Sequence, residues 1–309
     1  MAIRVEHLLV NVFNIDMALA SGRANEMFAA YGLEVDVRVT PNSTDQMRGL
    51  SSGAWQVAST AFDNVLGWSG REGAEINAVA QVSAGSTLPV YVRPEIKTWD
   101  DLRGKALAVD AVDTAYALVL RRVLSAHGLE MDRGDYTLIP KGTTGYRLDS
   151  MTQGETFAGV LNPPWDLKAE AAGMKRFADH REVLPDYPGG VYAVNRKWAG
   201  ENRPVLLKYL RAWTEALRWA QDEKNRAEAI RVLAKAEKID EKAAANRLRQ
   251  APKDGRLNLP GLQTVLDLRV QFGLLPPMGK DLAKYYDESF YRESSNSQAS
   301  LKDNEGGIR

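Results

Sequence analysis

Short apolar runs alternate with amphipathic helical patterns along the first two thirds of the chain. The runs have the length of buried strands, and the segments between them place apolar residues three or four positions apart. Predicted strands cover residues 3–10, 33–39, 55–59, 76–82, 88–92, 105–109, 136–139, 157–161 and 191–194. Predicted helices cover residues 17–31, 43–50, 62–68, 114–127, 144–151 and 165–172. This alternation predicts parallel strands with crossover helices, which is an α/β fold.

The alternation restarts after Gly85, so the chain holds two successive α/β lobes of similar layout. The turn-rich segment 185–190 and the strand after it indicate a return to the first lobe. The remainder is predicted to be helical, over residues 204–222, 225–236, 241–250, 262–272 and 280–291. Residues 292–309 are rich in Ser, Asn and Gly, which predicts a loose tail or a surface arm.

The stretch Thr98–Tyr116 best shows how such a lobe presents a ligand site. Gly104 permits a backbone reversal before the strand at 105–109, and Asp110–Thr114 then forms a polar loop that ends in two good N-cap residues. Open α/β sheets bind ligands at the carboxyl ends of their strands, near helix N-termini. The same stretch also suits an ordinary strand-to-helix turn without a ligand.

Composition narrows the possible functions. The 309 residues are enough for two domains, and 40 basic residues balance 40 acidic ones, so no nucleic-acid or anionic membrane partner is expected. The absence of cysteine excludes disulfides, thiolate metal sites and cysteine nucleophiles. No apolar run approaches the roughly 18 residues of a membrane span. Residues 18–21 resemble a signal cleavage site, but His7, Asn11 and Asp16 favour a strand and a helix there.

The candidate ligand residues are the polar and aromatic side chains of the loops that follow predicted strands. Hydroxyl and amide groups beside aromatic rings suit small-ligand recognition, although each Ser or Thr could instead only cap a helix. The ligand-binding set is Asn11, Phe13, Asn14, Asn42, Ser59, Thr60, Phe62, Ser83, Asp110, Asp113, Thr114, Tyr116, Lys141, Asn162 and Trp165.

Asp110 and Asp113 bear on the charge of the ligand. Two carboxylates in one loop would repel a bare anion unless a cation such as Lys141 offset them. They favour a ligand with an amine, a ring N–H or hydroxyl groups, although Asp113 could simply cap a helix while Asp110 is solvated. His7, His127 and His180 lack metal-ligand spacing, His180 lies in a predicted surface run, and no cofactor motif is present. We expect no cofactor, no metal and no catalytic residue.

Several motifs, in order, give the chain a resemblance to the type II periplasmic substrate-binding proteins of ABC transporters. The similar branch is the nitrate, sulfonate, taurine and thiamine-precursor one. The motifs are YGLEV at 31–35, LSSGAWQVA at 50–58, VRPEIKTWDDLRGK at 92–105, MTQGE at 151–155, NPP at 162–164 and the helical segment 207–219. Gln56 stands where that branch usually has Asp. The resemblance spans residues 3–250.

The resemblance implies two Rossmann-like lobes joined by two hinge crossings, with a helical C-terminal extension. Lobe I would comprise residues 1–86 and 189–309, lobe II residues 87–188, with hinges near 85–87 and 188–190. It further implies a monomeric solute-binding protein that holds a small molecule in the interlobe cleft and delivers it to an ABC transporter membrane component. Together with the loop residues above, this resemblance leads us to expect that molecule to be organic and aromatic or heterocyclic. Such a protein is periplasmic or extracytoplasmic if a signal peptide was removed, and cytoplasmic otherwise.

The alternative is an enzyme on the same fold, because this family includes relatives that act on aromatic or heteroaromatic substrates. Decarboxylase, hydrolase or pyrimidine-synthase-like chemistry would fall to Asp110, Asp113, Lys141 or His7 as acid or base. Cysteine-dependent desulfinase chemistry is excluded. The sequence favours the binding protein.

Overall fold

The computed structural model describes residues 5–295, and the chain forms two compact units. Unit 1 comprises the residues up to 85, residues 188–262 and those from 276 onward; unit 2 comprises residues 86–187 and 263–275. No helix within the described residues has both the length and the apolar character needed to cross a membrane.

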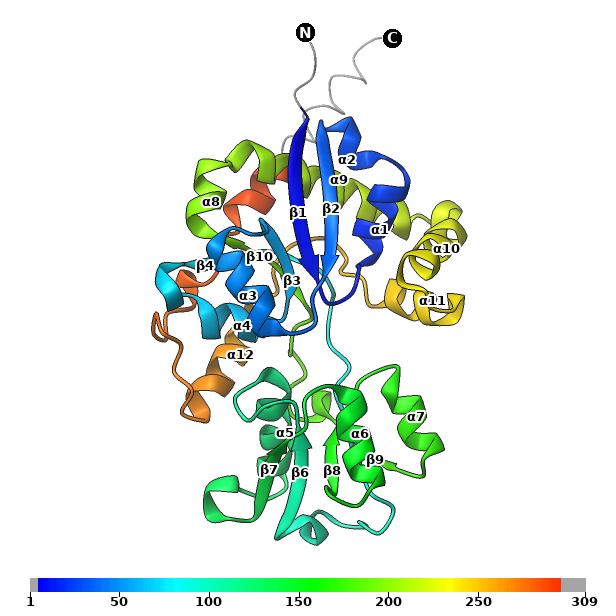
Figure 1. Ribbon diagram of the computed structural model, residues 1–309, viewed down its shortest axis with the longest axis vertical. Helices are drawn as coiled ribbons and strands as arrows, with labels where there is room; N and C mark the ends of the chain where they lie inside the picture. Colours follow the sequence, from blue (N-terminus) through cyan, green and yellow to red (C-terminus); the bar gives the residue numbers. More distant parts are fainter. Residues whose placement is uncertain (1–4, 296–309) are drawn as a thin grey trace. The chain divides into compact units, whose positions relative to one another are not determined.

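Unit 1 is built on a mixed sheet with the strand order β2-β1-β3-β10-β4 (Figure 1). Its strands are β1 (Glu6–Val12), β2 (Leu33–Val39), β3 (Val57–Thr60), β4 (Ile76–Gln81) and β10 (Val191–Asn195). β1 pairs in parallel with β2 and β3, whereas β10 lies between β3 and β4 and is antiparallel to both. The predicted return of the chain to the first lobe at residues 191–194 is therefore confirmed.

Helices surround the sheet of unit 1, some of them packed mainly on other helices. They are α1 (Met17–Ala24), α2 (Met27–Ala30), α3 (Ser43–Ser52), α4 (Phe62–Trp68), α8 (Arg196–Glu201), α9 (Arg203–Gln221), α10 (Arg226–Glu237) and α11 (Glu241–Arg249). The long helix α9 carries Tyr209, Trp213 and Leu217, which are buried against β-strand residues such as Val10 and Val57. This apolar face explains why the segment folds as a helix although four basic residues, of which only Arg218 is exposed, interrupt its apolar positions.

Unit 2 repeats the arrangement with the strand order β7-β6-β8-β5-β9. Its strands are β5 (Pro89–Val92), β6 (Lys105–Val109), β7 (Tyr136–Pro140), β8 (Ala158–Val160) and β9 (Lys175–Asp179). Its helices are α5 (Ala115–Ala126), α6 (Thr144–Thr152) and α7 (Trp165–Ala171). β6 pairs in parallel with β7 and β8, and β5 pairs antiparallel with β8 and β9. Short 3-10 helices lie at Arg71–Gly73, Trp99–Leu102, Met131–Arg133, His180–Glu182, Glu223–Asn225 and Leu282–Lys284.

Residues 263–275 join unit 2, although residues 189–309 were predicted to belong to lobe I. They include most of α12 (Leu259–Gln271), which begins among residues of unit 1. The guanidinium of Arg121 on α5 lies over the Phe272 ring at 4.1 Å, and Arg269 Nη1 donates to the carbonyl oxygen of Asp113 at 3.5 Å. These contacts attach the segment to α5 and to the loop before it.

Three further elements differ from the predictions. The helix expected over 17–31 is broken, because Glu26 adopts a left-handed conformation (φ 53°) between α1 and α2. The helix expected over 280–291 is instead a 3-10 turn followed by a bridge between Tyr286 and Ala78, and residues 289–295 are helical. β9 was not predicted. The loose tail predicted over 292–309 lies, from residue 296 onward, outside the described residues.

Candidate ligand-binding site

In unit 1, Asn11 lies inside β1 rather than in the loop after it. The strand continues to Val12, and Asn11 is only 2% exposed. Its Oδ1 accepts a hydrogen bond from Gln46 Nε2 at 3.1 Å, and the same Nε2 donates to the carbonyl oxygen of Ser59 at 3.1 Å. Gln46 on α3 therefore joins β1 to β3, and the Asn11 side chain belongs to this internal support.

The loop between β1 and α1 is the best-defined ligand candidate of unit 1. Phe13 is 38% exposed and Asn14 is also exposed, so both keep surface for a ligand. Asp16 ends the loop: its Oδ1 accepts from the Leu19 amide at 2.9 Å and from Trp213 Nε1 at 3.0 Å, and its Oδ2 accepts from the Tyr192 hydroxyl at 2.5 Å. Burial raises the pKa of Asp16 above its ordinary value, against the opposing effect of these hydrogen bonds.

The other predicted residues of unit 1 serve mainly local structure. Asn42 caps α3, because its Oδ1 accepts from the Asp45 amide at 2.8 Å. Ser59 and Thr60 lie in β3, and Thr60 Oγ1 accepts from Asn64 Nδ2 at 2.9 Å. Phe62 was expected to offer an aromatic plane, but it is 2% exposed because it begins α4 with its ring in the interior.

Ser83 lies where the chain leaves unit 1. Its Oγ accepts from the Gly190 amide at 2.9 Å, and Gly190 carbonyl oxygen accepts from the Val82 amide at 2.8 Å. A Cβ atom on Gly189 would lie 2.2 Å from Ser83 Oγ and 2.3 Å from its carbonyl oxygen, so only glycine fits there. The end of β4 and the residues just after it, immediately before the predicted hinge at 85–87, thus contact the other predicted hinge at 188–190 within unit 1.

In unit 2, Thr114 and not Asp113 caps α5. Thr114 Oγ1 accepts from the Ala117 amide at 3.4 Å and donates to Asp110 Oδ1 at 2.6 Å. Asp110 is therefore hydrogen-bonded within its own loop rather than simply solvated. Asp113 is exposed, and its carbonyl oxygen accepts the hydrogen bond from Arg269 Nη1.

Arg147 on α6 is the central side chain of this part of unit 2, and it is not among the predicted ligand residues. It is 2% exposed, and it donates from Nε to the carbonyl oxygen of Val160 at 3.1 Å, and from Nη1 to that of Gly142 at 2.8 Å. Its Nη2 donates to Thr144 Oγ1 at 2.8 Å. Burial lowers the pKa of Arg147, and the negative charge of Asp110 opposes that shift.

Three more predicted residues lie around Arg147. Its guanidinium lies 5.6 Å from the centre of the Tyr116 ring, and burial is the main cause that raises the pKa of Tyr116. Asn162 Oδ1 accepts from Thr144 Oγ1 at 2.7 Å. Asp110, Tyr116 and Asn162 are thus linked through Arg147 and its partner Thr144.

Lys141 and Trp165 have partners of their own. Lys141 Nζ lies 2.5 Å from Glu155 Oε2, so its charge is already paired. Trp165 is partly buried, Lys168 Nζ lies 4.0 Å from its ring centre, and a Cβ atom on Gly145 would approach the ring to 2.9 Å. The ring therefore packs closely against the start of α6.

The three histidines have separate environments. His7 is exposed and its Nδ1 lies 3.2 Å from Glu34, whereas the His127 ring stacks on Trp99 at 3.9 Å. His180 is fully buried, in contrast to the predicted surface run, and burial lowers its pKa. Within residues 5–295 no group of three or more His, Asp or Glu side chains could hold a metal ion.

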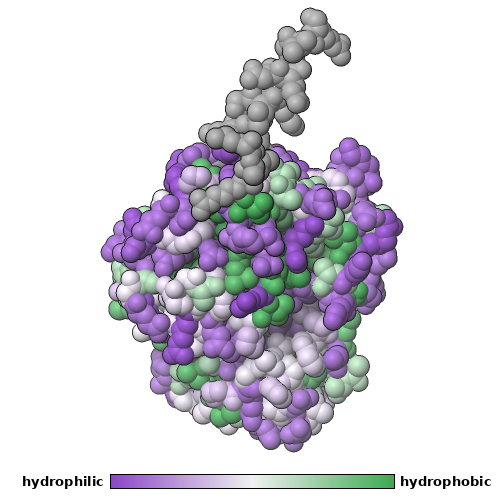
Figure 2. Space-filling view, turned by 45° about the horizontal axis from the view of Figure 1, so that its top comes forward, coloured by the Kyte–Doolittle hydropathy of each residue, from purple (hydrophilic) through white to green (hydrophobic). Residues whose placement is uncertain are grey.

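Within residues 5–295, five of the seven exposed large apolar side chains lie in or next to these loop regions, and Val5 and Leu275 lie elsewhere. Phe13 follows β1, and Val39 is the last residue of β2. Val112 lies in the loop before α5, and Tyr146 and Leu167 lie at the beginnings of α6 and α7. The side chains of Val39, Tyr146 and Leu167 are each about two thirds exposed. On the face drawn in Figure 2, hydrophilic residues cover most of the surface and hydrophobic areas are smaller.

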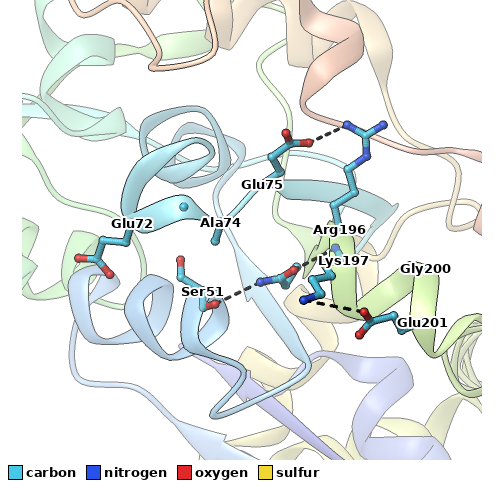
Figure 3. Close-up of a pocket in the computed structure, with 10 residues that line it drawn as sticks. Ser51, Glu72, Ala74, Glu75, Arg196, Lys197, Gly200 and Glu201 are labelled. Atoms are coloured by element: carbon cyan, nitrogen blue, oxygen red, sulfur yellow. Dashed lines mark hydrogen bonds and ion pairs between the residues drawn. The ribbon is translucent and has the colours of Figure 1, made fainter.

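A shallow groove of about 670 Å³ lies at the end of the unit 1 sheet where β4 begins and β10 ends (Figure 3). Its charged groups are largely paired: Arg196 Nη1 lies 2.7 Å from Glu75 Oε2, and Lys197 Nζ lies 4.0 Å from Glu201 Oε1. The lining residues are Ser51, Glu72, Gly73, Ala74, Glu75, Asn195, Arg196, Lys197, Gly200 and Glu201. None of them belongs to the predicted ligand set.

The sequence held signals for two of the residues that it did not single out. Asp16 stands three positions before Leu19 at the start of an apolar helical run, which is the N-cap position. Arg147 stands one turn before Met151 on the apolar face of its helix, a place where a charged side chain needs buried partners. Gln46 carries no such signal, because its partners are distant in sequence.

Comparisons with solved structures agree with this architecture. The chain is similar to the alkanesulfonate-binding protein SsuA from Xanthomonas axonopodis pv. citri bound to MOPS, with a TM-score of 0.71, 17% identity, and coverage of 91% of this chain and 98% of that one. It is also similar to the periplasmic nitrate-binding protein NrtA from Synechocystis PCC 6803, with a TM-score of 0.77, 14% identity, and coverage of 95% and 89%.

The desulfurization enzyme DSZB shares the fold as well, with a TM-score of 0.67, 15% identity, and coverage of 95% of this chain and 99% of that one. The two-lobed α/β fold of the periplasmic binding proteins is thereby confirmed. The comparison with curated protein sequences finds no match. The sequence model described as NMT1/THI5 like matches residues 17–227, which is more than half of the chain. The chain therefore belongs to the NMT1/THI5-like family.

Proposed function

We propose that this protein is the solute-binding component of an ABC import system and captures a small organic molecule. The observation that carries the proposal is the set of hydrogen-bonding and exposed apolar side chains at the carboxyl ends of the strands in each unit. Open α/β sheets bind ligands there. The fold shared with a nitrate-binding and an alkanesulfonate-binding protein supports the same function.

The charges in these loops favour a ligand without a net negative charge. The cation of Lys141 is paired with Glu155, and the buried guanidinium of Arg147 is occupied by two carbonyl oxygens and a hydroxyl. Asp110 lies near enough to Arg147 to affect its pKa, while Asp113 is exposed. A nitrate or a sulfonate would meet carboxylates in this loop with no unpaired cation of Lys141 or Arg147 to offset them.

The apolar side chains favour a ring-bearing ligand. Val112, Tyr146 and Leu167 are exposed in unit 2, and Phe13 is exposed in unit 1. Small-ligand sites combine such surface with a few polar groups that fix orientation. We propose an aromatic or heterocyclic molecule that carries an amine, a ring N–H or hydroxyl groups.

A role in transport also implies a membrane partner and a cellular location. The membrane component of an ABC transporter would receive the solute from this protein, which would act as a monomer on the extracytoplasmic side. Capture requires only that the ligand favour one conformation over another. No catalytic group is needed for that purpose.

An enzyme on the same fold is the second candidate, favoured by the likeness to DSZB. Its acid and base would be Asp110, Asp113, Lys141 or His7, since the chain has no cysteine. His7 is near the beginning of β1 and beside Glu34, at the other end of the strand from the candidate loop, and Lys141 is paired. These placements support binding over catalysis.

Native mass spectrometry of the purified protein tests the proposal first, because a retained small molecule would be weighed directly. Thermal unfolding is then followed with a neutral heteroaromatic compound, an aromatic amine, an alkanesulfonate and nitrate. A ligand at 100 times its Kd stabilises the folded state by about 2.7 kcal/mol.

We expect stabilisation by the heteroaromatic compound or the amine. Phe13→Ala and Asp113→Ala should each weaken it, whereas Asp149→Ala, a charge removed from the exposed side of α6, should not. Tight binding of the sulfonate or nitrate contradicts the ligand class. Conversion of a bound compound to a product of different mass favours the enzyme.

A further inference from the structure

An ion pair between α10 and α11 forms hydrogen bonds to the loop between β1 and α1, and Ile15 of that loop also packs on the two helices. Glu237, at the end of α10, accepts the Ile15 amide on Oε1 at 2.7 Å and Arg247 Nη1 on Oε2 at 2.6 Å. Arg247 Nη2 also lies 3.4 Å from Asn14 Oδ1. The Glu237 side chain is only 9% exposed, so this carboxylate is a buried acceptor for a backbone N–H of the candidate ligand loop.

An apolar cluster fixes the two helices to the helix that follows this loop. Met17 and Ala20 of α1 pack with Leu233 of α10 and Leu248 of α11. Ala220, Ala229 and Ala244 complete the cluster. The position of Glu237 is therefore set by packing rather than by a flexible surface contact.

The opposite side of the loop is held by Asp16. Its carboxylate accepts from Tyr192 on β10 and from Trp213 on α9. Ile15 and Asp16 are thus both anchored, while Phe13 and Asn14 remain exposed. The loop presents these two side chains from a backbone supported on both sides.

The loop and the Glu237–Arg247 pair that contacts it both lie outside the part of the chain that matches the family. The match covers residues 17–227, so it excludes the loop residues 13–16 as well as Glu237 and Arg247. We propose that the α10–α11 pair sets the ligand selectivity of this protein by positioning the loop that carries Phe13 and Asn14. Glu237 is the positioning residue. The selectivity role rests on the proposed function.

Two substitutions at Glu237 separate its two contacts. Glu237→Ala leaves the Ile15 amide without its acceptor and Arg247 without its charge partner. Glu237→Gln keeps an oxygen that can accept from Ile15 but loses the ion pair. Glu228→Ala is the matched control, because Glu228 is an exposed acid of the same helix that pairs only along it with Arg231.

Amide hydrogen exchange of residues 13–16, together with the ligand titrations described above, tests the proposal. Glu237→Ala should raise the exchange rate of the Ile15 amide at least tenfold and change the ranking of compounds in the panel. Glu237→Gln should raise exchange less, and Glu228→Ala should change neither.

Unchanged exchange in Glu237→Ala overturns the positioning role, and faster exchange with an unchanged ranking overturns the selectivity role. If Glu237→Ala does not fold, Glu237→Gln decides the question: protection and ranking identical to those of the unsubstituted protein contradict any role for the ion pair. Failure of the unsubstituted protein to bind any compound instead contradicts the proposed function. The positioning role of Glu237 is then tested by the exchange measurement alone.

Discussion

Asp16 joins three parts of unit 1, and its removal should be costly. Asp16→Ala removes the N-cap of α1, which typically costs about 1 kcal/mol. It also leaves the Trp213 indole N–H and the Tyr192 hydroxyl without their acceptor. A buried donor without a partner costs about 1–3 kcal/mol. We expect Asp16→Ala to lower the free energy of unfolding of unit 1 by about 3–7 kcal/mol at pH 7.

Asp16→Asn should behave differently because Asn is an equally good N-cap. Its amide oxygen can accept from Leu19 and Trp213, and its NH₂ group can donate to the Tyr192 oxygen. Asn also avoids the cost of burying a charge, so the loss at pH 7 should stay within about 1 kcal/mol.

The effect of pH on Asp16 has a definite sign. Burial raises its folded-state pKa above the ordinary value of 3.8. Stability from this group is therefore fully present below the unfolded-state pKa and is lost as pH rises through the folded-state pKa. Asn does not titrate. The stability of the unsubstituted protein relative to Asp16→Asn should consequently fall as pH rises above 3.8 through the folded-state pKa of Asp16.

Urea unfolding at several pH values, with amide exchange of the α1 residues to locate the change, measures both effects. Tyr192→Phe, which removes one donor but leaves the carboxylate, should cost only about 1 kcal/mol. The reasoning is refuted if Asp16→Ala costs less than Tyr192→Phe, if Asn is as harmful as Ala at pH 7, or if the pH trend has the opposite sign.

Three other substitutions probe the remaining supports. Gly189→Ala, which drives a Cβ atom into Ser83, should cost about 1–3 kcal/mol in urea unfolding, whereas Gly200→Ala, with no atom within 4 Å, should cost nothing; equal effects would contradict the close contact. Arg147→Met should cost about 3–5 kcal/mol, because it leaves three acceptors without their donor, and a loss below 1 kcal/mol would contradict that role. Thr114→Ala should lower the thermal stability of unit 2 by about 1 kcal/mol through loss of the α5 cap, and Thr114→Ser should restore it.

Where local pattern and tertiary packing agreed, the fold was predictable. The strand at residues 105–109 matches β6, and the helix expected over 114–127 matches α5 with Thr114 as its cap. β9 escaped prediction because it is an edge strand in which only Ala178 is buried, so it lacks an apolar run. The helix expected over 280–291 failed because pairing of that segment with β4 replaces local helical preference.

The candidate site was predictable as a set of loops but not as a set of contacts. Thr114, Asp110 and Asn162 were found from their positions after strands. The importance of Arg147 depends on carbonyl oxygens in two other segments, and that of Glu237 on an amide 222 positions earlier in the chain. Hydropathy patterns do not report such distant pairings.

The position of β10 between β3 and β4 constrains the order in which the two units can fold during synthesis. β4 joins the sheet of unit 1 through β10, and β10 begins at residue 191, after the whole segment 86–187 of unit 2. A ribosome therefore completes the strands of the second sheet before it supplies the strand that closes the first. Unit 1 must wait with β3 and β4 unjoined, and such long-range pairing is slow and exposes strand edges. Newly made chains should thus be most prone to aggregate before residue 195 emerges.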